Sequence, residues 1–231
     1  MQTIPPFVYL VDAAAALKGT GIRLGAQNLA VEEGGAYTGE VAGAMLRDVG
    51  CHYAIVGHSE RRSLYGETDE LVAAKYRAAQ RDGLVPILCV GETLEEREEG
   101  VTERVVERQL LAVLGQAGIG SFSDAVVAYE PVWAIGTGKT ATDNQAQEAH
   151  QFIRSLVQKR FGDSLAGSIR ILYGGSVKPA NIAELMAMQD IDGALVGGVR
   201  CGLGIHGREV QRNSALDGIS LRGRARRARR S

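Results

Sequence analysis

The stretch AVVAYEP at positions 125–131 is an apolar run that ends in a carboxylate and a proline. Two other stretches, VPILCVGE at 85–92 and YAIVGHSE at 53–60, also change from apolar residues to glycine and then to polar residues. Short apolar runs with such ends are typical of strands that are buried on both faces of a parallel sheet. On this pattern the sequence predicts six strands, at 22–28, 53–58, 85–91, 125–131, 169–175 and 193–198.

Helical patterns fill the intervals between these strands. We predict helices at 11–18, 39–49, 69–81, 102–114, 143–160 and 179–188. Thr102 and Thr142 offer side-chain oxygens that can cap two of them. Strands and helices that alternate about every 30–40 residues predict an α/β fold with a parallel sheet or barrel. No Pro/Ser-rich linker interrupts the pattern, so we expect one domain over residues 1–198.

The composition is that of a soluble globular protein. Of 231 residues, 45% are hydrophobic and 23% charged, and no apolar run approaches the roughly 18–20 residues of a membrane span. The three cysteines form no CxxC pair, and no basic segment followed by an apolar one opens the chain, so we expect a cytoplasmic protein. Residues 1–198 carry a net charge of −8, which disfavours nucleic-acid binding, whereas 199–231 carry nine arginines and a net charge of +7.

Residues capable of chemistry follow the predicted strands. The carboxyl ends of parallel strands form the active face of such folds, so this placement predicts an enzyme. Glu130 follows one strand, and His58 stands where another strand meets a helix N-terminus, whose dipole favours a neutral imidazole. A base and a neutral electrophile on neighbouring strand ends suit proton abstraction next to a carbonyl. Taken singly, each has a plain alternative: a solvated strand-end acid, or a hydrogen-bonded structural histidine.

Paired glycines follow the last two predicted strands, in YGGS at 173–176 and VGG at 196–198. Such pairs let backbone N–H groups close on an anion, and a helix that opens near Pro179 would add its positive end. The sequence therefore favours a phosphate site, although each pair alone also suits an ordinary turn.

Two other site types are disfavoured. The segment GTGKT at 136–140 is not a nucleotide-binding P-loop, because Trp133 occupies the position of the first glycine; the segment 131–139 suits a mobile lid instead. The four histidines and three cysteines show no metal-ligand spacing.

Eight segments, in order over residues 5–198, resemble the triosephosphate isomerase family: 5–10, 25–28, 35–40, 55–62, 87–92, 128–140, 172–177 and 192–198. The resemblance implies a TIM (β/α)8 barrel and an intramolecular aldose–ketose isomerase of glycolysis and gluconeogenesis. Its substrates would be dihydroxyacetone phosphate and D-glyceraldehyde 3-phosphate, interconverted through an enediolate without cofactor or metal. Glu130 would be the proton-shuttling base and His58 the neutral electrophile, roles for which this family is itself the standard example.

The same resemblance implies the rest of the site and the assembly. The backbone at Gly136, Ser176, Gly197 and Gly198 would hold the phosphate, and 131–139 would close over it. The loop around Thr38 resembles the loop that family dimers insert into the partner subunit, which implies a homodimer. Neither nucleic acid nor a membrane is expected as a partner.

The chain also departs from the family pattern. Family members begin with a strand that carries an Asn-x-Lys element, whereas MQTIPP at 1–6 leads straight into the second unit. We therefore expect an incomplete barrel with unpaired sheet edges over 1–198. No lysine is a candidate for the catalytic one, since Lys18 lies at the end of a predicted helix. Loss of one preorganised charge-stabilising group costs roughly 10²–10³ in rate, so we expect impaired activity.

Residues 199–231 form an atypical Arg-rich tail without the amphipathic helix that ends family members. We interpret the tail as an out-of-frame reading, and the amino-terminal departure as a late start codon or a damaged gene. The alternative to an isomerase is a non-catalytic, phosphate-binding or misfolded remnant of the family. An aldolase-like barrel is disfavoured, because no strand ends in a lysine that could form a Schiff base.

Overall fold

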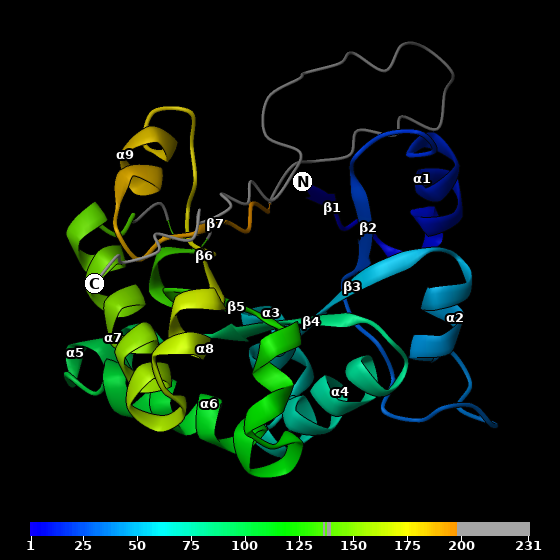
Figure 1. Ribbon diagram of the computed structural model, residues 1–231, viewed down its shortest axis with the longest axis horizontal. Helices are drawn as coiled ribbons and strands as arrows, with labels where there is room; N and C mark the ends of the chain where they lie inside the picture. The colour runs from blue at the N-terminus through cyan, green and yellow to red at the C-terminus, as the bar shows by residue number, and fades with distance from the viewer. Residues whose placement is uncertain (136, 138–139, 198–231) are drawn as a thin grey trace, which may run out of the picture.

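One parallel sheet organises the protein. The computed structural model describes residues 1–135, 137 and 140–197 (Figure 1). All strands in this part of the chain join one sheet in chain order, and every neighbouring pair is parallel. The strands are β1 Gln2–Thr3, β2 Arg23–Ala26, β3 Cys51–Val56, β4 Val85–Val90, β5 Val126–Tyr129, β6 Arg170–Tyr173 and β7 Gly193–Ala194.

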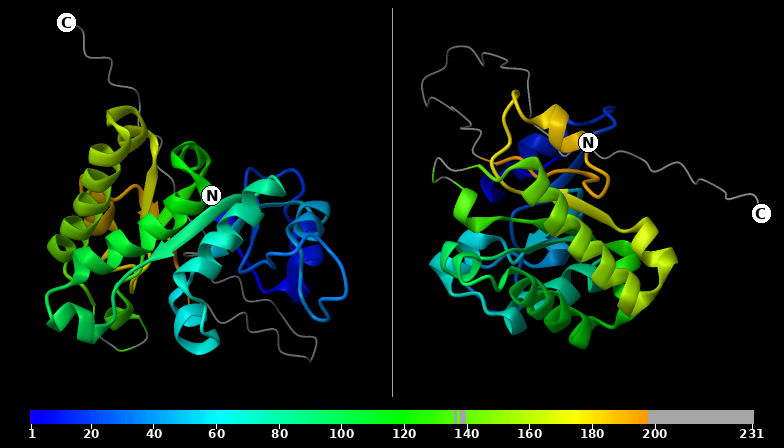
Figure 2. Two further views of the ribbon diagram at one scale, coloured as in Figure 1. Left: turned by 90° about the horizontal axis from the view of Figure 1, so that it is seen from below. Right: turned by 90° about the vertical axis from the view of Figure 1, so that its left-hand side faces the viewer.

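Helices cover the outer side of this curved sheet (Figures 1 and 2). The α-helices are α1 Leu10–Ala16, α2 Gly43–Asp48, α3 Ser59–Tyr65, α4 Asp69–Arg81, α5 Leu94–Glu98, α6 Thr102–Ala117, α7 Asp143–Phe161, α8 Asp163–Ser168 and α9 Ile182–Ala187. Three short 3-10 helices are η1 Phe7–Tyr9, η2 Ile119–Asp124 and η3 Val132–Ala134.

The sheet separates two apolar cores, because alternate residues of a strand face opposite sides. Tyr53 and Ile55 of β3 belong to an inner cluster that contains side chains from the strands and their ends but none from a helix. Ala54 and Val56 belong to the larger outer cluster, in which Val72 and its neighbours from α4 and other helices pack on the sheet. This is the layering of a (β/α) barrel, with side chains filling the interior.

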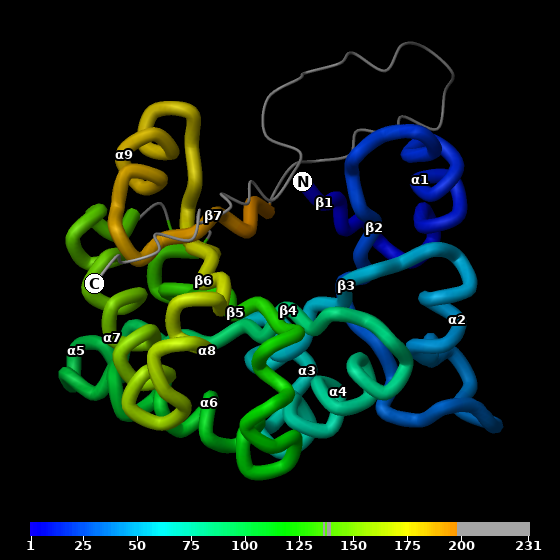
Figure 3. Tube along the Cα trace, viewed as in Figure 1, coloured from blue at the N-terminus to red at the C-terminus, as the bar shows by residue number. Residues whose placement is uncertain are grey.

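The barrel is incomplete, as predicted. In the part of the chain that the structure describes, seven strands run from β1 to β7, and these two do not pair with each other. Figure 3 shows them at the two ends of an arc. Both are only two residues long, whereas β3 and β4 each have six.

The six predicted strands are confirmed; five are shorter than predicted, and β3 has the predicted length but begins and ends two residues earlier. Helix α4 begins and ends where it was predicted, but two other starts were wrong. Helix α2 begins at Gly43 rather than at 39, because Gly39 adopts φ +92° in a turn that precedes it. Helix α9 begins at Ile182, because the Asn181 side chain accepts the Lys178 N–H and holds a turn there instead.

Several predictions fall outside the described residues. They are the positions of Gly136 and Gly198, most of the second half of the predicted lid, and the tail 199–231. Within residues 1–135, 137 and 140–197, no helix has the length and apolar character needed to cross a membrane.

The segment around Thr38 forms a turn. The backbone N–H of Glu40 donates to the carbonyl oxygen of Tyr37, and the Tyr37 side chain is 51% exposed.

Candidate active site

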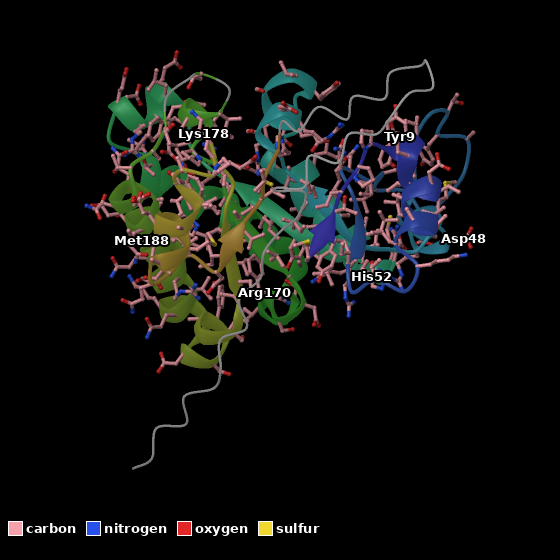
Figure 4. The ribbon with its side chains drawn as sticks, turned by 90° about the horizontal axis from the view of Figure 1, so that it is seen from above. Tyr9, Asp48, His52, Arg170, Lys178 and Met188 are labelled. Carbon is pink, nitrogen blue, oxygen red and sulfur yellow. The ribbon has the colours of Figure 1, made fainter. Side chains whose placement is uncertain are left out.

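The carboxyl ends of the strands form one rim of the molecule. Figure 4 shows Tyr9 and Lys178, which follow β1 and β6, on that rim, and His52 and Arg170, from the starts of β3 and β6, on the opposite one. Residues that follow the strands are therefore gathered on the first rim. In parallel α/β folds this is the rim that carries binding and catalytic groups.

On this rim Glu130 and His58 meet. The Nε2 atom of His58 lies 3.0 Å from Oε1 of Glu130. Glu130 directly follows β5 and is 2% exposed, whereas His58 follows β3 by two residues and its side chain is 27% exposed. The expectation that they stand on neighbouring strand ends was wrong, because β4 lies between β3 and β5.

Gly91, which directly follows β4, lets the backbone at Glu130 lie close to the end of β4. A Cβ atom at Gly91 would collide with the carbonyl oxygen of Glu130, so only glycine lets the two segments approach so closely. The Gln109 side chain from α6 holds this position, since it accepts the Gly91 N–H at 2.8 Å and donates to the Gly91 carbonyl at 3.1 Å. On the other side, a Cβ atom at Gly174 would lie 2.9 Å from Cγ of Glu130.

His58 also begins helix α3. It is the N-cap residue, and its Nδ1 accepts the backbone N–H of Glu60 at 3.2 Å. An accepting Nδ1 fits the neutral tautomer whose proton is on Nε2, so the Nε2–H is the group that points at Glu130.

The charge of Glu130 acts on this imidazole. Burial lowers the pKa of His58, but the hydrogen bond and the negative charge of Glu130 outweigh burial and raise it above its ordinary value. The prediction that the helix N-terminus keeps the ring neutral therefore leaves out the larger influence of the facing carboxylate.

Both carboxylate oxygens of Glu130 have donors. Oε2 accepts the Ser59 N–H at 2.9 Å, while Oε1, besides His58, lies 3.5 Å from the Ser59 hydroxyl. Sequence reasoning missed Ser59, although its position as first residue of α3 indicates that its N–H has no acceptor within the helix.

A buried acid anchors the residues that follow Glu130. Glu92 is fully buried and accepts hydrogen bonds from the hydroxyl of Tyr129 at 3.0 Å, the indole of Trp133 at 3.0 Å and the guanidinium of Arg97 at 3.1 Å. Arg97 also lies over the Trp133 ring, 4.6 Å from its centroid. The start of the predicted lid is thus tied to the strand end that carries Glu130.

The proposed phosphate donors lie after β6 and β7. Ser176 is half-buried and Gly197 exposed, and neither N–H donates to another residue in the described part of the chain. At Gly175 a Cβ atom would collide with the Tyr173 hydroxyl, so this loop depends on glycine. Neighbouring strands thus present two backbone donors that remain available to an anion.

Known proteins resemble this chain over most of its length. A model of the family described as triosephosphate isomerase matches residues 1–202. Proteins named triosephosphate isomerase from Nitrosococcus oceani and Thiobacillus denitrificans are 60% and 63% identical to this chain, each match covering 84% of the chain and 77% of the relative. The chain belongs to the triosephosphate isomerase family. The family assignment and the incomplete barrel predicted from sequence are therefore confirmed.

The structure defines the surroundings of Lys18 and Lys75. Lys18 lines a cavity with Arg23 and His52, at the amino ends of β2 and β3 and away from the site. Lys75 is buried and donates to Glu67 at 2.5 Å and to Asn28 at 2.8 Å, so its charge is already neutralised.

Over 1–135, 137 and 140–197, no group of three or more His, Cys, Asp or Glu side chains could hold an ion. The functional groups that the structure places at this site are a carboxylate, an imidazole and backbone N–H donors.

Proposed function

We propose that this chain interconverts dihydroxyacetone phosphate and D-glyceraldehyde 3-phosphate. The observation that carries the proposal is the contact of 3.0 Å between His58 Nε2 and Glu130 Oε1. On the same rim, the N–H groups of Ser176 and Gly197 have no acceptor among the residues that the structure describes. The names of the relatives, triosephosphate isomerase, support the same substrates.

In this proposal Glu130 is the base. Its carboxylate removes a proton from the carbon next to the substrate carbonyl, and the electron pair of that C–H bond forms a C–C double bond. The carbonyl oxygen takes up the resulting charge and accepts a hydrogen bond from the Nε2–H of His58. His58 Nε2 gives its proton to this oxygen and takes up the proton of the hydroxyl on the adjacent carbon, whose C–O bond becomes the new carbonyl. The carboxylic acid of Glu130 then returns its proton to the carbon that carried the original carbonyl, where the C–C double bond supplies the electron pair for the new C–H bond. The two sugars are isomers, so no oxidant, reductant or cofactor is needed.

Substrate must displace part of the network in the free protein. Both Glu130 oxygens and the His58 Nε2–H are engaged with each other or with Ser59. When Glu130 turns to the substrate, its raising effect on the pKa of His58 decreases, and the imidazole returns towards the neutral donor that the reaction needs.

The proposal also includes a phosphate site, a closing lid and a dimer. The backbone at Gly136, Ser176, Gly197 and Gly198 would bind the phosphate, and 131–139 would close as a lid. A homodimer through the loop around Thr38 and a cytoplasmic location in glycolysis follow from the family. We expect a rate well below that of the relatives, because Lys18 lies at the amino ends of the strands and Lys75 is paired with Glu67, so neither supplies a free positive charge beside Glu130 and His58.

A coupled isomerase assay on the purified chain tests the proposal. We expect measurable turnover, and a fall of about 10²–10⁴ in kcat in Glu130→Gln, because the amide cannot accept the proton. Glu148→Gln, on the exposed side of α7, is the matched control and should leave the rate unchanged. Turnover that is equal in the chain and in Glu130→Gln would contradict the proposal and favour a non-catalytic, phosphate-binding role.

A further inference from the structure

The side chain of Arg62, from α3, links the ends of β3 and β4. Its Nε donates to the Gly57 carbonyl at 2.8 Å, and one Nη donates to the Cys89 carbonyl at 3.4 Å. The paired register of β3 and β4 ends one residue before these positions, at Val56 and Leu88. The guanidinium therefore holds the two strand ends together where the backbone pairing between them stops.

Both of the positions that Arg62 holds adjoin the pair of His58 and Glu130. Gly57 immediately precedes His58. Cys89 lies against Glu130, and burial and the negative charge of Glu130 both raise the pKa of the Cys89 thiol. The Glu130 N–H donates at 2.8 Å to the carbonyl of Val90, the next residue of β4. A shift of one strand end against the other would therefore change the separation of His58 and Glu130.

The turn after β3 is fitted closely around this guanidinium. Gly57 adopts φ +71°, and a Cβ atom there would lie 2.9 Å from one Nη atom of Arg62 and 3.2 Å from the Cys89 carbonyl oxygen. A planar guanidinium can donate in two fixed directions at once, whereas an ammonium group on a flexible chain fixes neither direction. An arginine therefore suits this position better than a lysine would.

Two arginines share the carboxylate of Asp69, at the start of α4. Arg62 donates to its Oδ1 at 2.6 Å, and Arg108 from α6 donates to its Oδ2 at 3.0 Å. The Arg62 side chain is 18% exposed, but that of Arg108 is 59% exposed. In the described part of the chain the side chain of Arg108 bonds to Asp69 alone, whereas Arg62 also reaches the strand ends. Arg108 therefore provides a matched control for Arg62.

We propose that Arg62 is a positioning residue, whose hold on the Gly57 and Cys89 carbonyls keeps the His58 imidazole at its working distance from Glu130. It acts through these backbone groups, and Asp69 balances its charge. Its effect on turnover rests on the proposed function, whereas its effect on the contact between His58 and Glu130 does not. A misplacement of about 1 Å in a catalytic site can cost roughly 10²-fold in rate.

The first test is an NMR titration of the His58 imidazole in the full chain, without substrate. Glu130 faces this ring from the end of β5, and Glu60 and Arg61 lie beside it on α3. The hydrogen bond and charge of Glu130 outweigh burial and raise the pKa of His58. The measured pKa therefore reports how closely His58 and Glu130 are held.

Arg62→Lys is the variant for this titration, because it keeps a positive charge beside Asp69 but cannot hold both carbonyls. We expect the pKa of His58 to fall towards its ordinary value in Arg62→Lys. Arg108→Lys makes the same exchange at the other arginine on Asp69, and we expect it to leave the pKa of His58 unchanged. A role of Arg62 in stability alone would not move this pKa in the folded protein.

Steady-state kinetics are the second test. We expect Arg62→Lys to lower kcat by roughly 10–100-fold. KM should change little, because the proposed phosphate donors follow β6 and β7, away from the strand ends that Arg62 holds. Arg108→Lys should leave both kcat and KM unchanged.

Two results would overturn the proposal: a His58 pKa that is the same in Arg62→Lys and in the unaltered chain, or equal changes in Arg62→Lys and Arg108→Lys. If Arg62→Lys does not fold, Asp69→Asn replaces it, because the amide holds the guanidinium less tightly. A fall in the His58 pKa is again expected, and an unchanged pKa would again overturn the proposal. The expected fall in a chain without turnover would contradict the proposed function and leave the positioning role intact.

Discussion

The contact of 3.0 Å between His58 and Glu130 makes the stability of the protein depend on pH. The pKa of His58 in the folded state is raised above its ordinary value, chiefly by the hydrogen bond and charge of Glu130 that overcome burial. The imidazolium–carboxylate pair therefore contributes stability that is complete below the ordinary pKa of histidine. That contribution is lost as the pH rises through the raised pKa of the folded state.

We predict that His58→Gln lowers the thermal midpoint more at about pH 6 than at about pH 9, where the folded protein no longer carries the extra proton. His52→Gln is the control, since in the described part of the chain the His52 side chain contacts the Gly50 carbonyl and no carboxylate, so the substitution should change the thermal midpoint little. Thermal unfolding followed by circular dichroism measures the difference. Equal losses for His58→Gln at both pH values would contradict the ion pair.

Gly91 is the residue on which the close approach at Glu130 depends. A Cβ atom there would collide with the Glu130 carbonyl oxygen, and Gln109 holds both backbone groups of Gly91 in place. We predict that Gly91→Ala costs about 1–3 kcal/mol in the free energy of unfolding, because backbone must shift. Gly115→Ala, where a Cβ atom meets nothing within 4 Å, should be neutral or stabilising in urea unfolding.

Residue types at strand ends indicated which side chains matter, but not which strands stand side by side. His58 and Glu130 could be named because each follows an apolar run. That β4 separates their strands, and that Gly91 makes room across it, depends on sheet order, which a single sequence does not contain. Ser59 and Gln109 were missed for the same reason: their partners lie 71 and 18 residues away.

At the scale of elements, helix ends show how local rules succeed and fail. Thr142 was predicted to cap α7, and it does so in a complete capping box with Gln145. Thr102 was predicted to cap α6, but the N-cap is Val101, and no side chain caps that helix. The two threonines have similar neighbours in the sequence. They differ in position: Thr142 is the N-cap of its helix, whereas Thr102 is already the first helical residue.

These two helices provide a matched pair of variants. We predict that Thr142→Ala lowers the free energy of unfolding by about 1 kcal/mol, because the Gln145 N–H loses its acceptor. Thr102→Ala should change it by less than about 0.5 kcal/mol, since no cap is lost. Urea unfolding of both variants checks the difference, and equal losses would show that the Thr142 cap is unimportant.

Strands were predictable as elements because buried parallel strands are continuous apolar runs, which are visible without tertiary information. The bounds of helices were harder to predict than those of strands. Helix α4 combines an N-cap threonine with a clear apolar face, and its bounds were predicted correctly. Helices α5 and α8 are five and six residues long, too short for a periodic pattern to show, and were not predicted.

For the whole molecule, the family and the incompleteness of the barrel could both be predicted from sequence. The order of motifs predicted the family, and the expected incomplete barrel matches the seven strands that the structure describes, whose first and last members do not pair with each other. The burial of the Gln2 amide, which has no hydrogen-bond partner among the described residues, could not be foreseen, because the sequence does not reveal which polar side chain of a terminal strand becomes buried.

The central claim is that Glu130 moves a proton on carbon with the help of His58. Proton exchange measures this directly: dihydroxyacetone phosphate is incubated with the chain in D2O, and NMR follows deuterium at the carbon next to the carbonyl. We predict deuterium incorporation above the buffer rate in the unaltered chain, slowed by roughly 10²–10⁴ in Glu130→Gln. Exchange at the buffer rate in the unaltered chain, or exchange that Glu130→Gln leaves unchanged, would contradict the account.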